Sequence, residues 1–396
     1  MVPKGWSLVE ANEVCESISV GVVIKPAQYY VDESVGIKAF RSANVREGFI
    51  NDSGWVYFSQ KGHLANKNSQ LKSGDVLIVR TGYPGTACVV TPEFEGANAI
   101  DIVIARPQKD KVLPEYLCAY TNSSVGKSQV LNLQGGMAQK HLNVSAYQTL
   151  KIKLPPLLEQ KKIAKILSTW DKAIATTEQL LTNSQQQKKV LMQELLTGKK
   201  RLPGFSGKWE YYTLSDIAVI VMGSSPKSDA YNENGVGLPL IQGNADIKNR
   251  RSVPRIFTSE ITKECLPDDI LLSVRAPVGT IAISNHNACI GRGIATIRAK
   301  MDFNQAFIYQ WLLWFEPKWY SLSQGSTFES INSDDIKQLK IRVPSIEEQK
   351  SIAKILAVAD GEIETLKQKL HHLKQEKKAL MQQLLTGKRR VKTEAA

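Results

Sequence analysis

The sequence of 396 residues lacks the features of a membrane protein, an exported protein or a metal-binding protein. No run of about 18 apolar residues occurs, so we expect no membrane-spanning helix. No basic start followed by an apolar stretch suggests export. The five cysteines are scattered with no close pair, and the five histidines are no better placed. We therefore expect reduced thiols, no metal site and a cytoplasmic location.

Motifs for cofactor binding and catalysis are also missing. There is no G-x-G-x-x-G after a strand and no G-x-x-x-x-G-K-S/T phosphate loop. The Asn/Asp-Pro-Pro-aromatic motif of amino-methyltransferases is absent too, because Pro155-Pro156 follows a leucine and not Asn or Asp. No nuclease-like pairing of acidic residues with a lysine stands out. The sequence therefore predicts a binding protein with no catalytic residues and no cofactor of its own.

What the chain does contain is a segment that occurs twice. One copy opens at Ile152 with IKLPPLLEQKKIAKILSTWD, and the other opens 189 residues later at Ile341 with IRVPSIEEQKSIAKILAVAD. The match runs without a gap to LMQELLTGK and LMQQLLTGK, with about half of the aligned positions identical. This period is far longer than the roughly 20–50 residues of a solenoid repeat. It indicates a duplicated half-protein, which suits a target that also comes in two halves.

Each copy is predicted to form one long helix with a coiled-coil seam. Pro155-Pro156 and Pro344 suit helix starts, and Gly198 and Gly387 suit C-terminal caps. Steps of four and three select ten seam positions in each copy, namely Ile163, Leu167, Trp170, Ile174, Thr177, Leu181, Ser184, Lys188, Leu191 and Leu195, and then Ile352, Leu356, Ala359, Ile363, Leu366, Leu370, Leu373, Lys377, Leu380 and Leu384. One such helix alone is equally typical of ordinary packing, but two matched copies favour a mutual coiled coil.

The segments outside the helices repeat more faintly and are predicted to be mixed α/β lobes. DVLIVRTGYPGT from Asp75 matches DILLSVRAPVGT from Asp269. Short β-branched runs indicate strands at 76–79 and 270–272, and we expect helices at 114–122 and 306–314. The chain is therefore divided into a first lobe at 1–151, a central helical region at 152–203, a second lobe at 204–340 and a distal helical region at 341–396.

The net charge is +13, and its excess lies on the two helical regions. They carry +6 and +5, whereas the lobes carry +2 and 0. A basic protein of this kind usually meets a polyanion, although a solvated helix surface accounts for such charge runs equally well.

These features together resemble the specificity subunit of type I restriction–modification systems. The resemblance covers the whole chain and is carried by PPLLEQKKIAKIL from Pro155, its partner from Pro344, the two LLTGK helix ends, LIQGN from Leu240, DILLSVR from Asp269 and QGST from Gln324. It implies an α+β fold in which two target-recognition domains are joined by two long helices forming an antiparallel coiled coil, with a pseudo-twofold internal repeat. One departure is minor: the first lobe has AFRSAN, ending at Asn44, in place of LIQGN.

The resemblance also implies a function and partners. Each lobe would read one half of a bipartite, asymmetric site in double-stranded DNA, and the helices would set the spacing between the half-sites. Two methylation subunits that carry S-adenosylmethionine would dock on the helices. Restriction subunits, which use ATP and Mg for translocation and cleavage, would join outside them. The chain itself would be a non-catalytic specificity subunit.

Base readout requires donor and acceptor side chains on loops that reach a groove, and neighbouring glycines let the backbone approach DNA. The candidates in the first lobe are Arg41, Asn44, Arg80, Thr81, Tyr83, Gln134, Gly135, Gly136 and Lys140. Those in the second lobe are Gln242, Asn244, Arg275, Gln324, Ser326 and Thr327. Each also suits an ordinary turn, and some would contact phosphate without reading sequence.

Two other functions stay open at this point. The chain is also compatible with a non-catalytic coiled-coil scaffold whose lobes bind a partner other than DNA. A steep fall of affinity with salt would favour DNA over the scaffold, because binding to DNA releases counterions. A stand-alone methyltransferase is the third possibility, and it requires binding of S-adenosylmethionine by the isolated chain.

Overall fold

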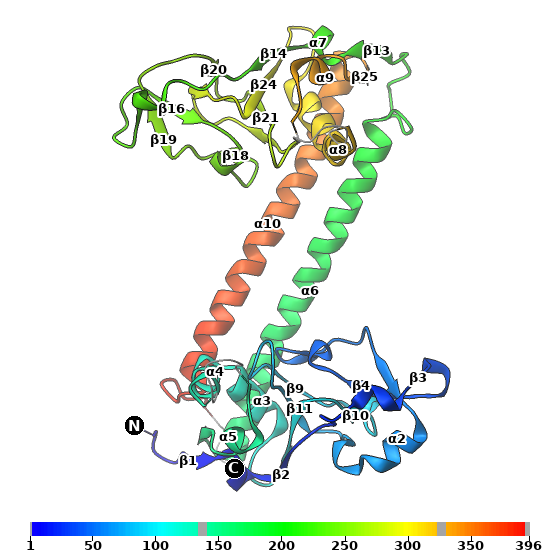
Figure 1. The fold of residues 1–396 in the computed structure, drawn as a ribbon, viewed down its shortest axis with the longest axis vertical. Helices are drawn as coiled ribbons and strands as arrows, with labels where there is room; N and C mark the ends of the chain where they lie inside the picture. Colours follow the sequence, from blue (N-terminus) through cyan, green and yellow to red (C-terminus); the bar gives the residue numbers. More distant parts are fainter. Residues whose placement is uncertain (1, 134–140, 323–329, 393–396) are drawn as a thin grey trace. The chain divides into compact units, whose positions relative to one another are not determined.

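The computed structural model describes residues 2–133, 141–322 and 330–392 (Figure 1). The chain folds into two compact units, each built from one lobe and parts of two long helices. The first unit comprises Met1–Glu178 and Gln368–Ala396, and the second comprises Gln179–Lys367. The first unit is thus assembled from two separate stretches of chain, whereas the second is one continuous stretch.

The two predicted helices are α6 (Leu157–Leu195) and α10 (Ile346–Leu384), each of 39 residues. Both begin just after the prolines that suit a helix start. Both end shortly before a glycine with a φ of +72°, at Gly198 and Gly387, where only glycine avoids strain. The predicted helix bounds are therefore confirmed. In the described part of the chain, no helix combines the length and apolar character needed to cross a membrane.

The predicted seam is confirmed, because all ten positions in each helix are buried or half-buried. In the first unit, the Lys377 ammonium lies 2.5 Å from Asp171, and the Lys374 ammonium lies 2.7 Å from Glu178. The numbering rises along α6 while it falls along α10, so the two helices are antiparallel in this unit.

The second unit shows the same antiparallel pairing. Here the Lys188 ammonium lies 2.5 Å from Asp360, and the Ser184 hydroxyl donates to Glu362 at 2.9 Å. Three of the polar seam residues, Lys188, Lys377 and Ser184, thus reach partners on the facing helix, while the fourth, Thr177, hydrogen-bonds within its own helix. Such polar contacts specify one register at some cost in stability.

The described residues of the first lobe form two four-stranded sheets and two small ladders. One sheet has the order β2-β11-β8-β9, with strands Cys15–Val20, Ile102–Pro107, Val76–Val79 and Ala87–Val89. The other has the order β10-β4-β7-β3, with strands Asn98–Ala99, Ile37–Phe40, Val56–Phe58 and Tyr30–Val31. The ladders pair β1 (Ser7–Glu10) with β12 (Lys151–Leu154) and β5 (Val45–Arg46) with β6 (Phe49–Ile50). The α-helices are α1 (Ala11–Val14), α2 (Gln60–Ala65), α3 (Pro114–Asn122), α4 (Ser124–Asn132) and α5 (Val144–Gln148).

The core of the first unit joins this lobe to the helix ends. Tyr116 of α3 and Tyr147 of α5 are fully buried in one cluster with Ile163 of α6 and Leu384 of α10. Burial of this much apolar surface is the main force that fixes the lobe on the helices. The strand at 76–79 and the helix at 114–122 have the predicted bounds.

The described part of the second lobe contains two larger sheets. The first has the order β14-β24-β21-β22-β18-β17, with strands Ala218–Met222, Ile294–Ala299, Ile270–Ser273, Ile281–Ile283, Arg251–Ser252 and Ile247–Lys248. The second has the order β15-β19-β16-β23-β20, with strands Tyr231–Asn232, Ile256–Thr258, Leu238–Ile241, Ala288–Ile290 and Glu264–Cys265. A ladder pairs β13 (Glu210–Thr213) with β25 (Lys340–Val343), and the α-helices are α7 (Leu214–Ile217), α8 (Gln305–Leu322) and α9 (Ser333–Lys337).

Helix α8 is longer than the segment 306–314 that the sequence predicts. It continues through Pro317, a residue that removes one backbone hydrogen bond from a helix interior. Its aromatic side chains recur every four residues, and the rings of Trp311, Phe315 and Trp319 follow one another with centroids 5.1 Å apart. This aromatic row packs into the hydrophobic core of the second unit, and the free energy gained by that packing outweighs the free energy lost through the proline.

Candidate nucleic-acid interface

The turn between β8 and β9 is the best-defined candidate in the first unit. Arg80 stands at its start and is buried, with its guanidinium 2.5 Å from Asp101. Its Nε donates to the Leu142 carbonyl at 3.0 Å, and the Leu142 N–H donates back to the Arg80 carbonyl at 3.0 Å. Another guanidinium nitrogen contacts His141. Arg80 therefore fixes the turn against the segment at 141–142 instead of pointing outward.

The tip of this turn is exposed. Thr81 lies in solvent, and the Tyr83 side chain is 81% exposed. Gly82 and Gly85 both have positive φ, so the tight turn requires glycine there. An exposed aromatic ring and a hydroxyl on a rigid turn are suited to contacts with sugar, phosphate or base edges.

The side chains of Asn44 and Arg41 form hydrogen bonds within the first lobe. Asn44 is fully buried, and its amide nitrogen donates to the Asn51 and Ser53 carbonyls at 3.1 and 2.9 Å. Its side-chain oxygen accepts the Arg41 N–H at 2.9 Å, while the Arg41 guanidinium contacts the Gly54 carbonyl. Asn44 therefore shapes its loop and offers no exposed atom to DNA in this conformation.

The corresponding turn of the second unit joins β21 and β22. The Ile331 N–H donates to the Val274 carbonyl at 3.0 Å, which repeats the contact between Leu142 and Arg80. Val274 occupies the position of Arg80 and is likewise buried, while Arg275, which follows it, is exposed as Thr81 is. The single proton of the Ser273 hydroxyl is shared between the carbonyls of Arg275 and Pro277, at 3.0 and 2.8 Å, and this contact closes the turn.

Gln242 and Asn244 are half-exposed. The Gln242 N–H donates to the buried carboxylate of Asp246 at 2.8 Å. Asp246 ends a short 3-10 helix, as Asn44 does in the first lobe, and it makes the matching backbone bond to Val253. The structural counterpart of Asn44 is thus Asp246, and not Asn244, to which the sequence comparison assigns it.

Arg292 is a candidate that the sequence analysis overlooked. It is exposed between two buried glycines, and a Cβ on Gly293 would lie 2.3 Å from the Gln242 carbonyl oxygen. The Val274 N–H donates to the Gly293 carbonyl at 2.9 Å, so Arg292 stands close to both Arg275 and Gln242. The Gly-Arg-Gly triplet at the start of a β-branched run is the signal that would have found it.

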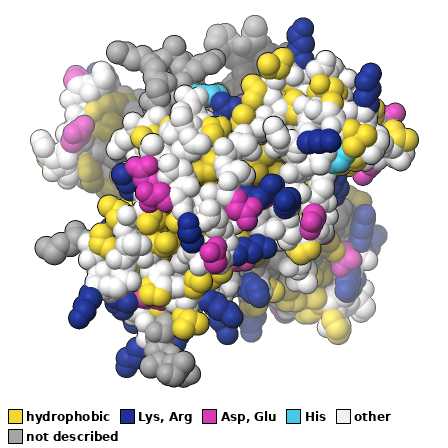
Figure 2. Space-filling view, turned by 90° about the horizontal axis from the view of Figure 1, so that it is seen from below, with side chains coloured by type: hydrophobic (Ala, Val, Ile, Leu, Met, Phe, Trp, Pro, Cys, Tyr) yellow, Lys and Arg dark blue, Asp and Glu magenta, His cyan; other side chains and the backbone are white. Residues whose placement is uncertain are grey.

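Seven of the predicted residues lie outside the described residues, namely Gln134, Gly135, Gly136, Lys140, Gln324, Ser326 and Thr327. The described residues that follow them, Leu142 and Ile331, are bonded to the two turns. The face drawn in Figure 2 has lysine and arginine side chains spread among acidic and apolar ones instead of gathered in a single basic patch. On this face the charge distribution does not single out a DNA-binding surface.

Possible metal ligands and cysteine thiols are two features of the described residues that bear on catalysis. In residues 2–133, 141–322 and 330–392, no group of three or more His, Cys, Asp or Glu is placed to hold a metal ion. All five cysteines are buried and free, and burial raises the pKa of Cys15 and Cys88 to about 12. These two thiols stay protonated near neutral pH, so they are poor nucleophiles.

Comparison with known proteins gives a consistent result. The family model described as the type I restriction modification DNA specificity domain matches residues 3–183 and 206–375. A protein of Methanocaldococcus jannaschii, described as "Putative type I restriction enzyme MjaX specificity subunit", is 32% identical over 99% of this chain and 95% of its own length.

Solved structures agree with the sequence relatives. A chain from a study of complex assembly and conformational transition of the type I R-M system has a TM-score of 0.63 and 26% identity, with 97% of this chain and 98% of that chain covered. The HsdS subunit from Thermoanaerobacter tengcongensis has a TM-score of 0.51 and 26% identity, with 98% of each chain covered.

Proposed function

This chain belongs to the type I restriction–modification DNA specificity family, and from that membership we propose that each lobe reads one half of a split, asymmetric DNA site. The lobe surface for this task is the β8–β9 turn in the first unit and the β21–β22 turn in the second. Each turn is proposed to act together with the segment at 134–140 or 323–329, because Leu142 and Ile331, which follow these segments in the chain, are bonded to the turns.

The observation that carries the proposal is the matched pair of contacts between Leu142 and Arg80 and between Ile331 and Val274. Most predicted DNA-contacting residues belong to these turns or to the sequence segments that precede Leu142 and Ile331. Two lobes that share this frame but carry different side chains on it are suited to reading two different sequences. Arg80, for example, is replaced by Val274, and Thr81 by Arg275.

The exposed residues divide by chemistry. Arg275 and Arg292 are able to contact guanine bidentately or to neutralise phosphate, whereas Thr81 and Tyr83 suit hydrogen bonds and apolar contacts. Gln134, Lys140, Gln324, Ser326 and Thr327 are proposed to extend these surfaces, with Gly135 and Gly136 allowing close approach. Arg41, Asn44 and Arg80 are positioning residues that hold loops in shape.

The helices are proposed to serve as spacer and as docking surface. Thirty-nine residues rise by roughly 58 Å at 1.5 Å per residue, so their length is able to set the distance between half-sites. Leu158 and Val358 are more than half exposed on α6 and α10 and suit contact with another protein. Two methylation subunits would bind there and supply S-adenosylmethionine, and restriction subunits would supply ATP- and Mg-dependent activities. The chain itself is proposed to be non-catalytic and cytoplasmic.

The test is to map the methylated DNA motif produced when variants are co-expressed with their methylation subunits. Tyr83→Ala should weaken recognition of one half-site and Arg275→Ala that of the other. Tyr211→Ala, which removes another exposed tyrosine from β13, is the matched control and should leave both half-sites unchanged. A change in both half-sites from either lobe variant would contradict independent reading.

Salt dependence separates DNA recognition from a scaffold role. If Arg275 contacts phosphate, its loss should reduce the slope of log affinity against log salt by about one and weaken all sequences alike. If it reads a base, its loss should relax one motif position. DNA affinity independent of salt would favour the scaffold, and methyl transfer by the highly purified chain alone would show that it is an enzyme.

A further inference from the structure

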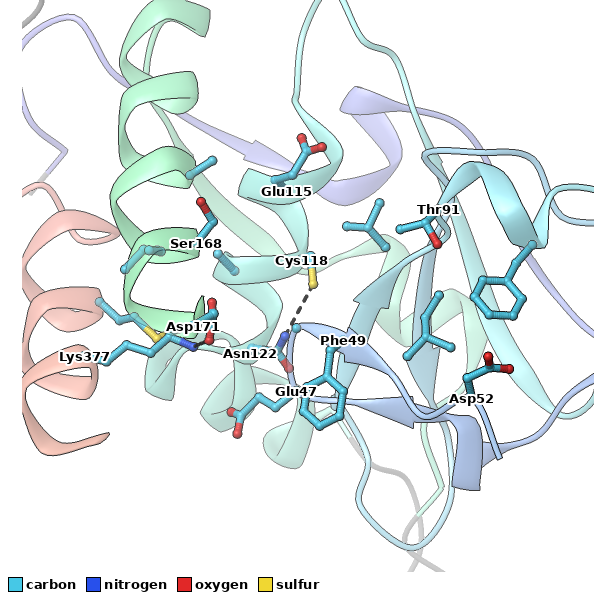
Figure 3. Close-up of a pocket in the computed structure, with 18 of the residues that line it drawn as sticks. Glu47, Phe49, Asp52, Thr91, Glu115, Cys118, Asn122, Ser168, Asp171 and Lys377 are labelled. Carbon is cyan, nitrogen blue, oxygen red and sulfur yellow. Dashed lines mark hydrogen bonds and ion pairs between the residues drawn. The ribbon is translucent and has the colours of Figure 1, made fainter. Parts of the chain in front are cut away.

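A pocket of about 500 Å³ opens in the first unit between the lobe and the parts of α6 and α10 that belong to this unit (Figure 3). Its walls come from the β5–β6 turn, β9, α3 and one side of each long helix. This volume lies within the roughly 300–1,000 Å³ of small-molecule sites. The turns described above for DNA recognition do not contribute to the pocket.

The floor of the pocket is apolar. Phe49, Ile50 and Val89 line it from the lobe, and Leu167 and Met381 line it from the helices. Phe49 is 61% exposed, so a ligand with an apolar body would remove a large aromatic surface from water. Cys118 adds a neutral group, because burial raises the pKa of its thiol well above the usual value.

The rim carries more negative than positive charge, in a chain of net charge +13. Five carboxylates and one lysine line the pocket, namely Glu47, Asp52, Glu93, Glu115, Asp171 and Lys377. Three of the carboxylates are in ion pairs, with Lys127, Lys38 and Lys377. Within the described chain, Glu93 and Glu115 have no such partner. The rim therefore favours a guest that carries positive charge.

One hydroxyl in the wall lacks a hydrogen bond. Thr91 Oγ1 is buried and has no partner among the described residues, and Thr91 lines the pocket (Figure 3). A buried polar atom without a partner costs free energy that a ligand N–H or O–H would recover. The wall therefore offers an acceptor beside an apolar floor and an acidic rim.

The second unit shows why this hollow exists in the first. The Leu113 N–H donates to Gln160 at 2.9 Å, and the Asn304 N–H donates to Gln349 in the same way, which aligns α3 with the start of α8. By this alignment Ala119 corresponds to Gln310.

The consequence of this difference lies at the helix surface. The Gln310 amide reaches Asp360 at 2.8 Å, and Asp360 is the repeat counterpart of Asp171. A glutamine thus occupies, in the second unit, the space that Ala119 leaves open beside Asp171 in the first.

We propose that this pocket binds a small organic cation with a flat apolar body, such as an arylalkylamine. The apolar body lies on Phe49 and Leu167, and the ammonium group lies at the rim within reach of Glu93 and Glu115. A donor on the ligand meets Thr91 Oγ1. The site is separate from DNA recognition and is specific to the first unit.

The test is calorimetric titration of the full chain, without DNA, with three indoles of nearly equal size. Tryptamine is the cation, tryptophol its neutral counterpart, and indole-3-propionate the anion. We expect one tryptamine to bind per chain, with tryptophol about threefold to tenfold weaker because exposed carboxylates each contribute modestly. Indole-3-propionate should bind more weakly still. No detectable binding of tryptamine, or equal binding of tryptophol, would overturn the proposal.

Variants then place the ligand. Ala119→Gln introduces the residue found at the matching position of the second unit. It should weaken the affinity for tryptamine by about tenfold or more, since the glutamine side chain fills the cavity. Ala119→Ser is its control and should bind as the original chain does. Thr91→Val should reduce the affinity for tryptamine by about threefold to tenfold, because the hydrogen bond to the threonine hydroxyl is lost. Gln310→Ala, in the other unit, should leave the affinity of the first-unit pocket for tryptamine unchanged. Undiminished binding by an Ala119→Gln chain with an unchanged circular dichroism melt would refute the site.

Discussion

The junctions between lobe and helices in the two units share one ion pair and differ in the hydrogen bonds around it. In the first unit, the Arg390 guanidinium donates to both carboxylate oxygens of Glu159 at 2.7 Å. In the second, Arg201 donates to both oxygens of Glu348 at 2.8 and 2.7 Å. In the first unit, Arg390 also donates to the Lys4 carbonyl at 2.8 Å, a bond without a counterpart at Arg201 among the described residues. Each glutamate lies in the first turn of its long helix and is nearly inaccessible, with 3% and 1% of its side chain exposed. A carboxylate there is also favoured by the helix dipole.

The tryptophans beside these ion pairs are bonded differently. Trp6 Nε1 donates to Glu159 at 3.0 Å, whereas Trp209 Nε1 is buried with no partner among the described residues. Both indole rings still lie beneath the arginine, at 5.6 Å for Arg390 and 5.8 Å for Arg201. The bidentate ion pair between arginine and glutamate and the packing of the arginine on an indole ring are therefore common to both junctions. In the described part of the chain, the hydrogen bond from the indole N–H to the glutamate is present only in the first unit.

The largest expected effect comes from removing the buried glutamates. Glu159→Ala should lower the free energy of unfolding of the first unit by about 3 kcal/mol, because three hydrogen bonds are lost while Arg390, which is 44% exposed, is able to turn to water. Glu348→Ala should cost less by about 1 kcal/mol, the value of the missing indole bond. Urea unfolding followed by hydrogen exchange in each unit measures both losses.

The control for these two variants is Glu178→Ala, which removes an exposed partner of Lys374 and should cost less than about 0.5 kcal/mol. Equal losses from Glu159→Ala and Glu348→Ala would show that the Trp6 bond contributes nothing.

A smaller difference is expected between the two aspartates of the seam. Asp360 binds both Lys188 and Gln310, whereas Asp171 binds Lys377 and faces the pocket. Asp360→Ala should therefore cost about 2 kcal/mol and Asp171→Ala about 1 kcal/mol, since each leaves a mostly buried lysine without its partner.

The double variant Asp360→Ala with Gln310→Ala tests the reason for this difference. If the glutamine contact explains it, the double variant should fall short of the sum of the two single losses. Losses that simply add would contradict that explanation. Urea midpoints at an unchanged slope provide the measurement.

The sequence predicted the helical frame because periodicity and caps are local signals. Four-and-three spacing identified seam positions that the structure buries, and the prolines and Gly198 and Gly387 marked the helix ends. Lys188 and Lys377 were correctly placed on the seam, but their partners Asp360 and Asp171 lie far away in the chain. Pairing across such distances depends on the fold and leaves no local pattern.

The candidate site was harder to predict, because a polar residue beside glycine has the same sequence signature whether it points inward or outward. Arg80 looked like a DNA contact, yet its partners are Asp101 and the segment at 141–142. Asn44 turned inward to its own loop, while Arg292 was overlooked because only close packing of Gly293 on Gln242 makes its position special. Exposure at these loops follows from tertiary contacts that no spacing rule describes.

The smallest and sharpest comparison is between the two tryptophans. Trp6→Phe keeps an aromatic face under Arg390 but removes the donor to Glu159, so we expect a loss of about 1 kcal/mol beyond the change in ring size. Trp209→Phe removes a buried N–H that has no partner among the described residues. The free energy gained by removing this unpaired donor should offset the free energy lost with the buried area of the indole ring. The unfolding free energy of this variant should stay within about 0.5 kcal/mol of the original value. Urea midpoints of the two variants, read in their own units by hydrogen exchange, make the measurement. Equal losses of unfolding free energy would mean that the volume of the ring stabilises both junctions and that the Trp6 hydrogen bond contributes nothing measurable. A loss confined to Trp6→Phe would show that the Trp6 bond stabilises the first junction beyond the ion pair that both junctions share.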